Sequence, residues 1–425
     1  MRKPRPVRSK RWVVALGLPL IAVSRGRADD SVGLSHQTYS EAHDRTQVQT
    51  ETLRIEKTIT PWLDVTLRET YDGISGATPI GAPEIRQLTM RDPRTGVPIP
   101  PSSITGFTRQ LDAVSGASQT GGSGPMAQNQ LPLSESIDVR LATDIAVALT
   151  HGPHRLVPEF SFSNESDYRS YGFALNYSYE FNEKNTTLNL GWSHAYDRVL
   201  ANPFTFLTHS TVKNTDNFLI GGTQLLSPGT LLGANLTIGY AHGYLNDPYL
   251  GVVFNESDLD PDNRVVLSPE KRPSTRNSQA LLLSLTQSVA PLDASIESTY
   301  RFYHDSYGIF ASTVSVAWFQ RIGRSIVVSP SARYYYQTAA DFYAIQFPGD
   351  PTNNPQAVPR FYSADYRLSE LETITLGLEA NVKLRDQWDL HLGYQRYWMR
   401  GLDGETSQSA YPTANIFTIG LTYSF

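Results

Sequence analysis

The sequence contains no cysteine. This absence excludes disulfide bonds, thiolate metal sites, covalent c-type haem attachment and acylation of a lipoprotein cysteine. The fold must therefore be held together by backbone hydrogen bonds and non-covalent side-chain contacts.

Long apolar runs are also lacking, and charge is sparse. Beyond the N-terminus no stretch approaches the roughly 20 apolar residues that a membrane-spanning helix needs, and the mean hydropathy is −0.32. Charged residues make up 18% of the 425 residues, and aromatic residues 11%. These values exclude a helical membrane protein. They are compatible with a membrane β-barrel, whose strands alternate lipid-facing and lumen-facing residues.

The first 28 residues have the pattern of a cleaved secretion signal. A basic segment from Arg2 to Arg11 precedes an apolar segment from Trp12 to Val23, and Gly26-Arg27-Ala28 then precedes Asp29. We expect cleavage after Ala28, which leaves residues 29–425 as the mature chain. The cleaved part holds eight Lys/Arg and no acid, so 28 basic and 41 acidic residues remain, a formal charge of −13. This acidity disfavours nucleic acid as a partner.

From residue 31 onward, apolar and polar residues alternate in strand after strand. The last strand places Phe417, Ile419, Leu421, Tyr423 and Phe425 on one face, with small polar residues between them. Residues 171–181 carry aromatic rings towards both ends of one face and Gly, Ala, Asn, Ser and Glu on the other, which suits a wet lumen. We predict a single all-β domain, an antiparallel transmembrane β-barrel of about 16 strands (range about 14–18).

The expected strands are residues 31–40, 46–59, 62–71, 135–150, 154–164, 168–181, 186–197, 213–226, 230–244, 275–289, 292–304, 308–320, 325–338, 366–384, 387–399 and 414–425. Long connections at 72–134, 198–212, 245–274, 339–365 and 400–413 alternate with short ones. This parity predicts short periplasmic turns, long external loops and both termini in the periplasm. The longest connection, 72–134, is rich in Gly, Pro, Ser and Thr. Its composition fits either an external flap or a constriction folded into the lumen.

Several segments resemble motifs of a bacterial family, domain of unknown function 3570. They are YDGISGATP at 71–79, GYLNDPY at 243–249, PEKRPSTR at 269–276, YRFYHDSYGI at 300–309 and RYYYQTAADFY at 333–343. The family is thought to form outer-membrane barrels, so the resemblance implies a barrel in the bacterial outer membrane. It supplies no catalytic residues.

By loop parity these motifs lie at the external rim. One explanation is structural, because Asn-Asp-Pro and Arg-Pro form turns and buried Arg–carboxylate pairs fix loops. The other is a shared binding surface at the barrel mouth, made from tyrosine rings of these motifs together with charged rim residues. We favour the structural explanation. The rim cluster consists of Asp247, Arg272, Arg276, His304, Asp305 and Asp341.

Strand phase also predicts which charges line the lumen, because an Arg or Lys facing lipid at the midplane would cost about 2–4 kcal/mol. The inward-facing charges are Arg54, Glu56, Asp64, Arg68, Asp138, Arg140, Asp144, Glu180, Glu297, Arg301, Arg333, Glu379 and Lys383. They could line an open pore or close it as a salt-bridge mesh.

Sixteen strands leave room for an aqueous channel, so we expect a porin-like channel for small polar solutes. The alternative is a structural sheath or assembly partner for an exported polymer or a surface electron-transfer complex, with no solute channel of its own. Expected partners are outer-membrane lipid and the barrel-assembly machinery. The sequence leaves open a homotrimer or a surface-assembly partner.

Metal and catalytic chemistry have weak support. Asp258, Asp260 and Asp262 alternate in an acidic loop that could hold Ca²⁺, but the glycine and glutamate of an EF-hand are missing, and a solvated loop is favoured. We expect no other cofactor. We also expect no enzyme, because the neighbours His304 and Asp305 point to opposite faces of an extended chain.

Overall fold

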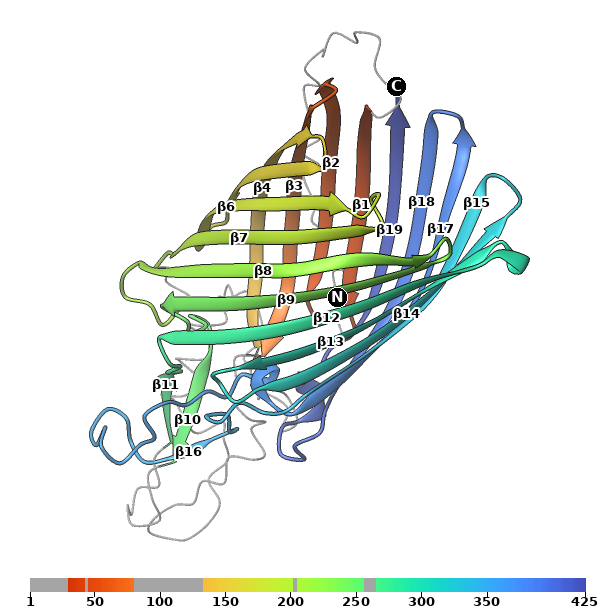
Figure 1. The fold of residues 1–425 in the computed structure, drawn as a ribbon. Helices are drawn as coiled ribbons and strands as arrows, with labels where there is room; N and C mark the ends of the chain where they lie inside the picture. Colours follow the sequence, from red (N-terminus) through yellow and green to blue (C-terminus); the bar gives the residue numbers. More distant parts are fainter. Residues whose placement is uncertain (1–29, 43–44, 80–132, 202–204, 256–264) are drawn as a thin grey trace, which may run out of the picture.

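The computed structural model describes residues 30–42, 45–79, 133–201, 205–255 and 265–425. Within them, sixteen antiparallel strands close into one barrel, seen from the side in Figure 1. No described helix is long and apolar enough to cross a membrane. The predicted all-β class and the number of strands are confirmed. The signal segment lies outside the described residues.

The barrel strands match the predicted ranges closely. They are β1 (Ser31–Glu41), β2 (Gln47–Thr60), β3 (Leu63–Pro79), β4 (Leu133–His151), β5 (His154–Asn164), β6 (Tyr168–Phe181), β7 (Thr186–Val199), β8 (Thr211–Ser227), β9 (Thr230–Gly243), β12 (Thr275–Val289), β13 (Ala294–Asp305), β14 (Phe310–Ile322), β15 (Ile326–Gln337), β17 (Leu371–Arg385), β18 (Trp388–Gly401) and β19 (Thr413–Ser424).

The barrel closes through the pairing of its first and last strands. β1 and β19 pair over eleven positions, beginning with Ser31 opposite Ser424. The backbone N–H of Phe425 donates to the Asp30 carbonyl at 2.9 Å. The Lys57 ammonium pairs with the Asp30 carboxylate and lies 5.4 Å from the centre of the Phe425 ring. Because the ladder closes, the barrel has no free strand edge.

The two faces of the closed sheet differ sharply. Residues paired across strands share a face, so the alternation within each strand is carried around the whole barrel. The outward face is apolar and exposed, with Leu34 and Phe417 at 55%, Ile220 at 53% and Leu376 at 49%. Polar and small residues occupy the inward face, and the barrel is therefore inverted relative to a water-soluble one.

A few polar residues share the outward phase of β1 to β4, and they bond to one another. The His36 ring nitrogen lies 2.7 Å from the Glu51 carboxylate, and the Thr143 hydroxyl donates to Glu69 at 2.9 Å. These pairs satisfy polar groups that stand among apolar neighbours.

The predicted loop parity is confirmed. No turn at one end of the barrel exceeds four residues, whereas residues 200–210, 244–274, 338–370 and 402–412 all connect strands at the other end. We call these the short-turn end and the long-loop end. The paired ladder of β3 and β4 continues to Pro79 opposite Leu133, so the connection is shorter than the expected 72–134. Its remaining residues, 80–132, lie outside the described part of the chain.

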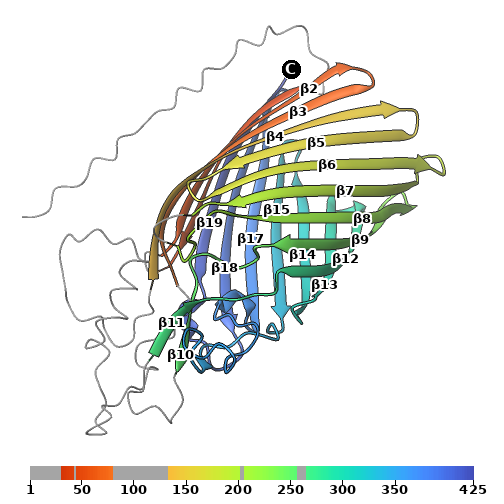
Figure 2. The ribbon, with the colours of Figure 1, turned by 90° about the vertical axis from the view of Figure 1, so that its left-hand side faces the viewer.

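A cap of folded loops covers part of the long-loop end; it comprises residues 244–255, 265–274, 306–309, 338–370 and 402–412. It contains a three-stranded sheet of β10 (Gly251–Asn255), β11 (Val265–Pro269) and β16 (Phe347–Pro348), and Figure 2 shows β10 and β11 beyond the end of the barrel wall. No strand is predicted from the sequence in the connections 245–274 and 339–365, so this sheet is unexpected.

The apolar core of the described residues lies in this cap instead of the barrel. One cluster packs Tyr307, Ile309, Phe342 and Leu368 together, and another surrounds Phe254. Most side chains that face into the barrel are polar, small or charged, with exceptions such as Val157, Leu219 and Leu282. No comparable apolar cluster forms there among the described residues. The cap thus buries its apolar side chains inside, whereas the barrel places them on its outer face.

The expected strand at 366–384 begins five residues later than predicted. Residues Tyr366–Leu368 form one 3₁₀ turn, and the Asp365 side chain caps it by accepting a hydrogen bond from the Arg367 N–H at 3.0 Å. This side-chain hydrogen bond favours the turn over strand pairing, because the Asp365 carboxylate satisfies a backbone donor that would otherwise be free.

Packing of the cap onto β18 requires a glycine at position 401. A Cβ added there would collide with the ring of Tyr411, which is buried and bonded through its hydroxyl to Ser369 at 2.6 Å. We expect Gly401→Ala to lower the free energy of unfolding by about 1–3 kcal/mol, measured by urea titration in lipid vesicles. Gly73→Ala, where a Cβ meets only one atom at 3.9 Å, is the control. Equal stability of both variants would contradict this packing.

Candidate functional site

The inward-facing charges are accessible to water within the described structure. Arg54, Arg68, Arg301, Arg333 and Lys383 are all classed as exposed, although each points away from the apolar outer face. A packed interior would bury these side chains, and Lys and Arg are almost never fully buried without a partner. The interior of the barrel wall is therefore solvated where the chain is described.

Few of these charges are paired, and the pairs that form are local. Arg54 lies 2.5 Å from Glu56 on the same strand, and Arg140 lies 2.5 Å from Asp72 on the neighbouring strand. Glu180 meets Lys184 in the adjacent turn at 3.6 Å. Among the described residues, no ion pair joins opposite walls of the barrel. The predicted lumen charges do not form a mesh that closes the interior there.

The cap is fixed by a network of paired charges, which we call the cap network: Asp247, Glu270, Arg272, Asp365 and Arg367. Glu270 and Asp365 are buried, whereas Arg367 is half exposed. Nitrogens of the Arg272 guanidinium lie 2.7 Å from Glu270 and 2.9 Å from Asp365. Arg367 lies 2.8 Å from Asp365 and 2.6 Å from Asp247. Two arginines thus join three segments that are distant in the sequence, which is the role that the structural explanation of these motifs requires.

Two carboxylates of the cap network respond in opposite directions to this environment. Burial raises the pKa of Glu270 to about 6, because the opposing attraction of Arg272 does not fully offset the loss of solvent. Burial alone would also raise the pKa of Asp365, but Arg367 and Arg272 together hold it below its ordinary value. The attraction of the neighbouring arginines therefore outweighs the effect of burial at Asp365 but not at Glu270.

The other predicted rim residues take separate positions. Arg276 pairs with Asp305, whose side chain is fully buried. The His304 ring stacks on Phe310 with the centroids 4.0 Å apart, on the outward face. His304 and Asp305 therefore point to opposite sides and form no dyad. Asp341 stands apart, with its N–H donating to the Tyr307 carbonyl at 2.9 Å.

A cavity of about 700 Å³, the rim cavity, lies between the cap and the barrel wall. Its lining includes Asp247, Arg272 and Arg276 from the predicted cluster, but neither His304, Asp305 nor Asp341. The lining also includes six tyrosines, five of which lie in the family-like motifs of the sequence. They are Tyr168, Tyr244, Tyr249, Tyr303, Tyr307 and Tyr335.

An acidic cluster borders the rim cavity. Ligand atoms of Asp138, Glu165 and Asp167 all lie within 4.8 Å of one another, so the predicted lumen charge Asp138 belongs to this group. Burial and the neighbouring carboxylate of Asp167 raise the pKa of Glu165, and burial raises that of Asp167 although the Tyr249 hydroxyl opposes the change. The predicted calcium ligands Asp258, Asp260 and Asp262 lie outside the described residues.

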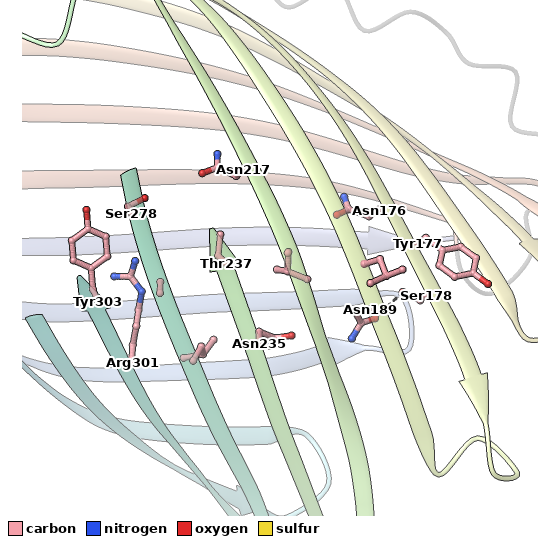
Figure 3. A pocket seen from close by; sticks show the side chains of 14 residues that line it. Asn176, Tyr177, Ser178, Asn189, Asn217, Asn235, Thr237, Ser278, Arg301 and Tyr303 are labelled. Atoms are coloured by element: carbon pink, nitrogen blue, oxygen red, sulfur yellow. Dashed lines mark hydrogen bonds between the residues drawn. The ribbon is translucent and has the colours of Figure 1, made fainter. Parts of the chain in front are cut away.

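A second cavity of about 480 Å³, the wall cavity, lies along the inner surface of β6 to β13. Figure 3 shows its polar side chains rising from successive strands, with Arg301 and Tyr303 at one end of the row. Four asparagines dominate it: Asn176, Asn189, Asn217 and Asn235. Sequence analysis recorded Asn176 as inward-facing but did not identify the group, because its members are up to 59 positions apart and meet only through strand pairing.

Protonation of Glu270 should stabilise the cap. Its folded pKa of about 6 lies above the ordinary 4.5, so its contribution is fully present below about pH 4.5 and is lost as the pH rises through 6. Hydrogen exchange of cap amides, corrected for intrinsic rates, should show that local opening costs about 1 kcal/mol more at pH 5 than at pH 7.5. Glu270→Gln should remove this difference, whereas Glu405→Gln, at an exposed position of the cap, should retain it. An unchanged pH dependence in Glu270→Gln would contradict the assignment.

No curated protein matches the sequence. Similar solved structures include a "Bacterial polysaccharide outer membrane secretin" (9% identity, TM-score 0.46, covering 93% of this chain and 98% of that one). Another is "CdiB from Acinetobacter baumannii" (10%, 0.47, 93% and 60%), so this chain spans 60% of that protein's length. A third is the "CymD monoaromatic hydrocarbon channel" (8%, 0.39, 93% and 88%). These barrels differ in function and are too distant to assign one here. The family model described as "Protein of unknown function (DUF3570)" matches residues 22–425, and the chain belongs to that family.

Proposed function

We propose that this protein is a channel of the bacterial outer membrane through which small polar solutes pass. In this proposal the segment 1–28 directs export and is removed, and the strand that ends in Phe425 is recognised by the barrel-assembly machinery. The short-turn end faces the periplasm, and the cap faces the outside.

The outer surface supports a membrane setting. Large apolar side chains such as Leu34, Ile220 and Phe417 are about half exposed, which is costly in water and favourable in lipid. Outward aromatics flank this apolar band at both ends. Trp62, Phe181 and Trp388 are exposed near the short turns, and Tyr171, Tyr196, Tyr240 and Trp398 towards the long loops, as in the aromatic girdles of membrane barrels.

The single observation that carries the proposal is that the described interior is accessible to water and that no ion pair among the described residues joins its opposite walls. Exposed inward-facing charges such as Arg68, Arg301 and Arg333 need water around them, and ion pairs among the described residues stay on one wall or in one turn. Sixteen strands give a barrel wide enough for an aqueous channel. Mixed charges along its wall favour polar solutes over apolar ones.

Planar-bilayer recording tests this proposal directly. The purified full-length mature protein should produce stable conductance steps in potassium chloride, because a wet lumen of this width passes hydrated ions. Heat-denatured protein serves as the control. A bilayer that stays sealed at every voltage after confirmed insertion would contradict the proposal. If such a non-conducting barrel co-purified with a stoichiometric partner, the sheath or assembly role would take its place.

A further inference from the structure

The inner surface of the barrel is divided into a charged part and a neutral part. Most predicted lumen charges lie on β2 to β4 and on β13 to β17. Between the Lys213–Asp197 pair at the rim and Glu180 at the short-turn end, inward positions of β6, β7, β8 and β9 carry no charge. These positions hold Gly, Ala, Ser, Thr and Asn, apart from Leu219.

The asparagines of this neutral surface lie over glycines of neighbouring strands. Asn176 pairs with Gly191, and a Cβ on that glycine would come within 2.9 Å of the Asn176 amide oxygen. Asn217 over Gly239 repeats the arrangement at 2.8 Å, and Asn235 lies opposite Gly221 in the same way. Each glycine leaves room for an amide to lie flat across the strands. The result is a broad, low trench instead of a ridged wall.

The amides of the trench keep unused hydrogen-bonding capacity. Asn217 donates to the Ser193 hydroxyl at a long 3.4 Å, Asn189 accepts from the Ser178 hydroxyl at 2.9 Å, and Asn176 donates to the carboxylate of Glu159 on the neighbouring strand β5 at 3.0 Å. A carboxamide offers two donors and an oxygen with two acceptor sites. Most of these sites therefore face the lumen, where donors and acceptors alternate without net charge.

The trench continues into the rim cavity. Arg301 and Tyr303 line both cavities, and further tyrosines follow towards the outside. A tyrosine presents a flat apolar face together with a hydroxyl. This combination suits a sugar ring, which has C–H groups on its faces and hydroxyls on its edge. The trench crosses five neighbouring barrel strands, β6, β7, β8, β9 and β12. With about 4.8 Å between strands it spans about 20 Å, which is longer than one sugar unit.

We propose that this trench, with the tyrosines above it, is a binding track for an uncharged, hydroxyl-rich oligosaccharide. Hydroxyl groups both donate and accept, so they pair with amides at any rotation and need no charged partner. The inference rests on the proposed channel function and names the class of solute that the channel guides. Charged solutes would engage the charged part of the wall more strongly than the neutral amides of the trench.

Two measurements on the same protein test the track. In single-channel recordings, linear neutral hexasaccharides (maltohexaose, cellohexaose and xylohexaose) should be added in turn, beside hexagalacturonate and hexalysine. At least one neutral hexasaccharide should interrupt the current reversibly, and hexalysine should not. Saturation-transfer NMR of the detergent-solubilised protein with the same sugars reports binding whether or not the barrel conducts.

Variants then locate the binding. Asn217→Leu combined with Asn235→Leu keeps side-chain size and removes two amides, and it should weaken binding of the interrupting hexasaccharide about tenfold. Asn381→Leu, on the inward face of β17, is the matched control and should bind as the parent does. A conducting barrel that no neutral hexasaccharide interrupts, or equal binding by both variants, would overturn the track. A sealed bilayer with intact NMR binding would remove the channel function but leave the track standing.

Discussion

Closure of the strand ladder between β1 and β19 is the constraint on which the other features depend. Eleven residue pairs and the Phe425–Asp30 backbone hydrogen bond complete it, so every barrel strand has a partner on each side. With all ladder positions used, side chains can point only outward or inward, in strict alternation. The apolar half of each strand must then lie on the outside, because the inside of a sixteen-stranded barrel is too wide for side chains to fill.

This inversion explains why the core lies elsewhere. Without a packed interior in the described barrel, the large buried apolar residues gather in the cap, around Tyr307 and Phe254. The cap network then fixes segments near residues 247, 270 and 366 against one another. Charged residues thus have two separate uses in one molecule. In the cap they form ion pairs around the buried carboxylates of Glu270 and Asp365, whereas along the barrel wall most are exposed or half-buried and meet water.

Strand positions could be predicted because they depend on local alternation. The pattern from Phe417 to Phe425 specifies both a strand and its outward face, and counting connections back from it correctly gave the parity of all loops. The cap could not be predicted in this way. Phe254 pairs in parallel with Phe347, and Arg272 meets Asp365, over separations of 93 residues in each case. No local pattern encodes such partners. The trench asparagines were missed for the same reason, since Asn217 and Gly239 become neighbours only through the register of β8 and β9.

The central claim is that one face of the strands lines a water-filled interior. The absence of cysteine makes this claim directly testable, because any introduced thiol is the only one in the chain. Single cysteines at Asn217, Phe218, Leu219 and Ile220 on β8 should be exposed to a charged, membrane-impermeant thiol reagent, with the protein in lipid vesicles. The structure predicts rapid labelling at 217 and 219 and protection at 218 and 220, whose side chains are on the apolar outer face. Protection at all four positions, or labelling without alternation, would contradict a water-filled lumen.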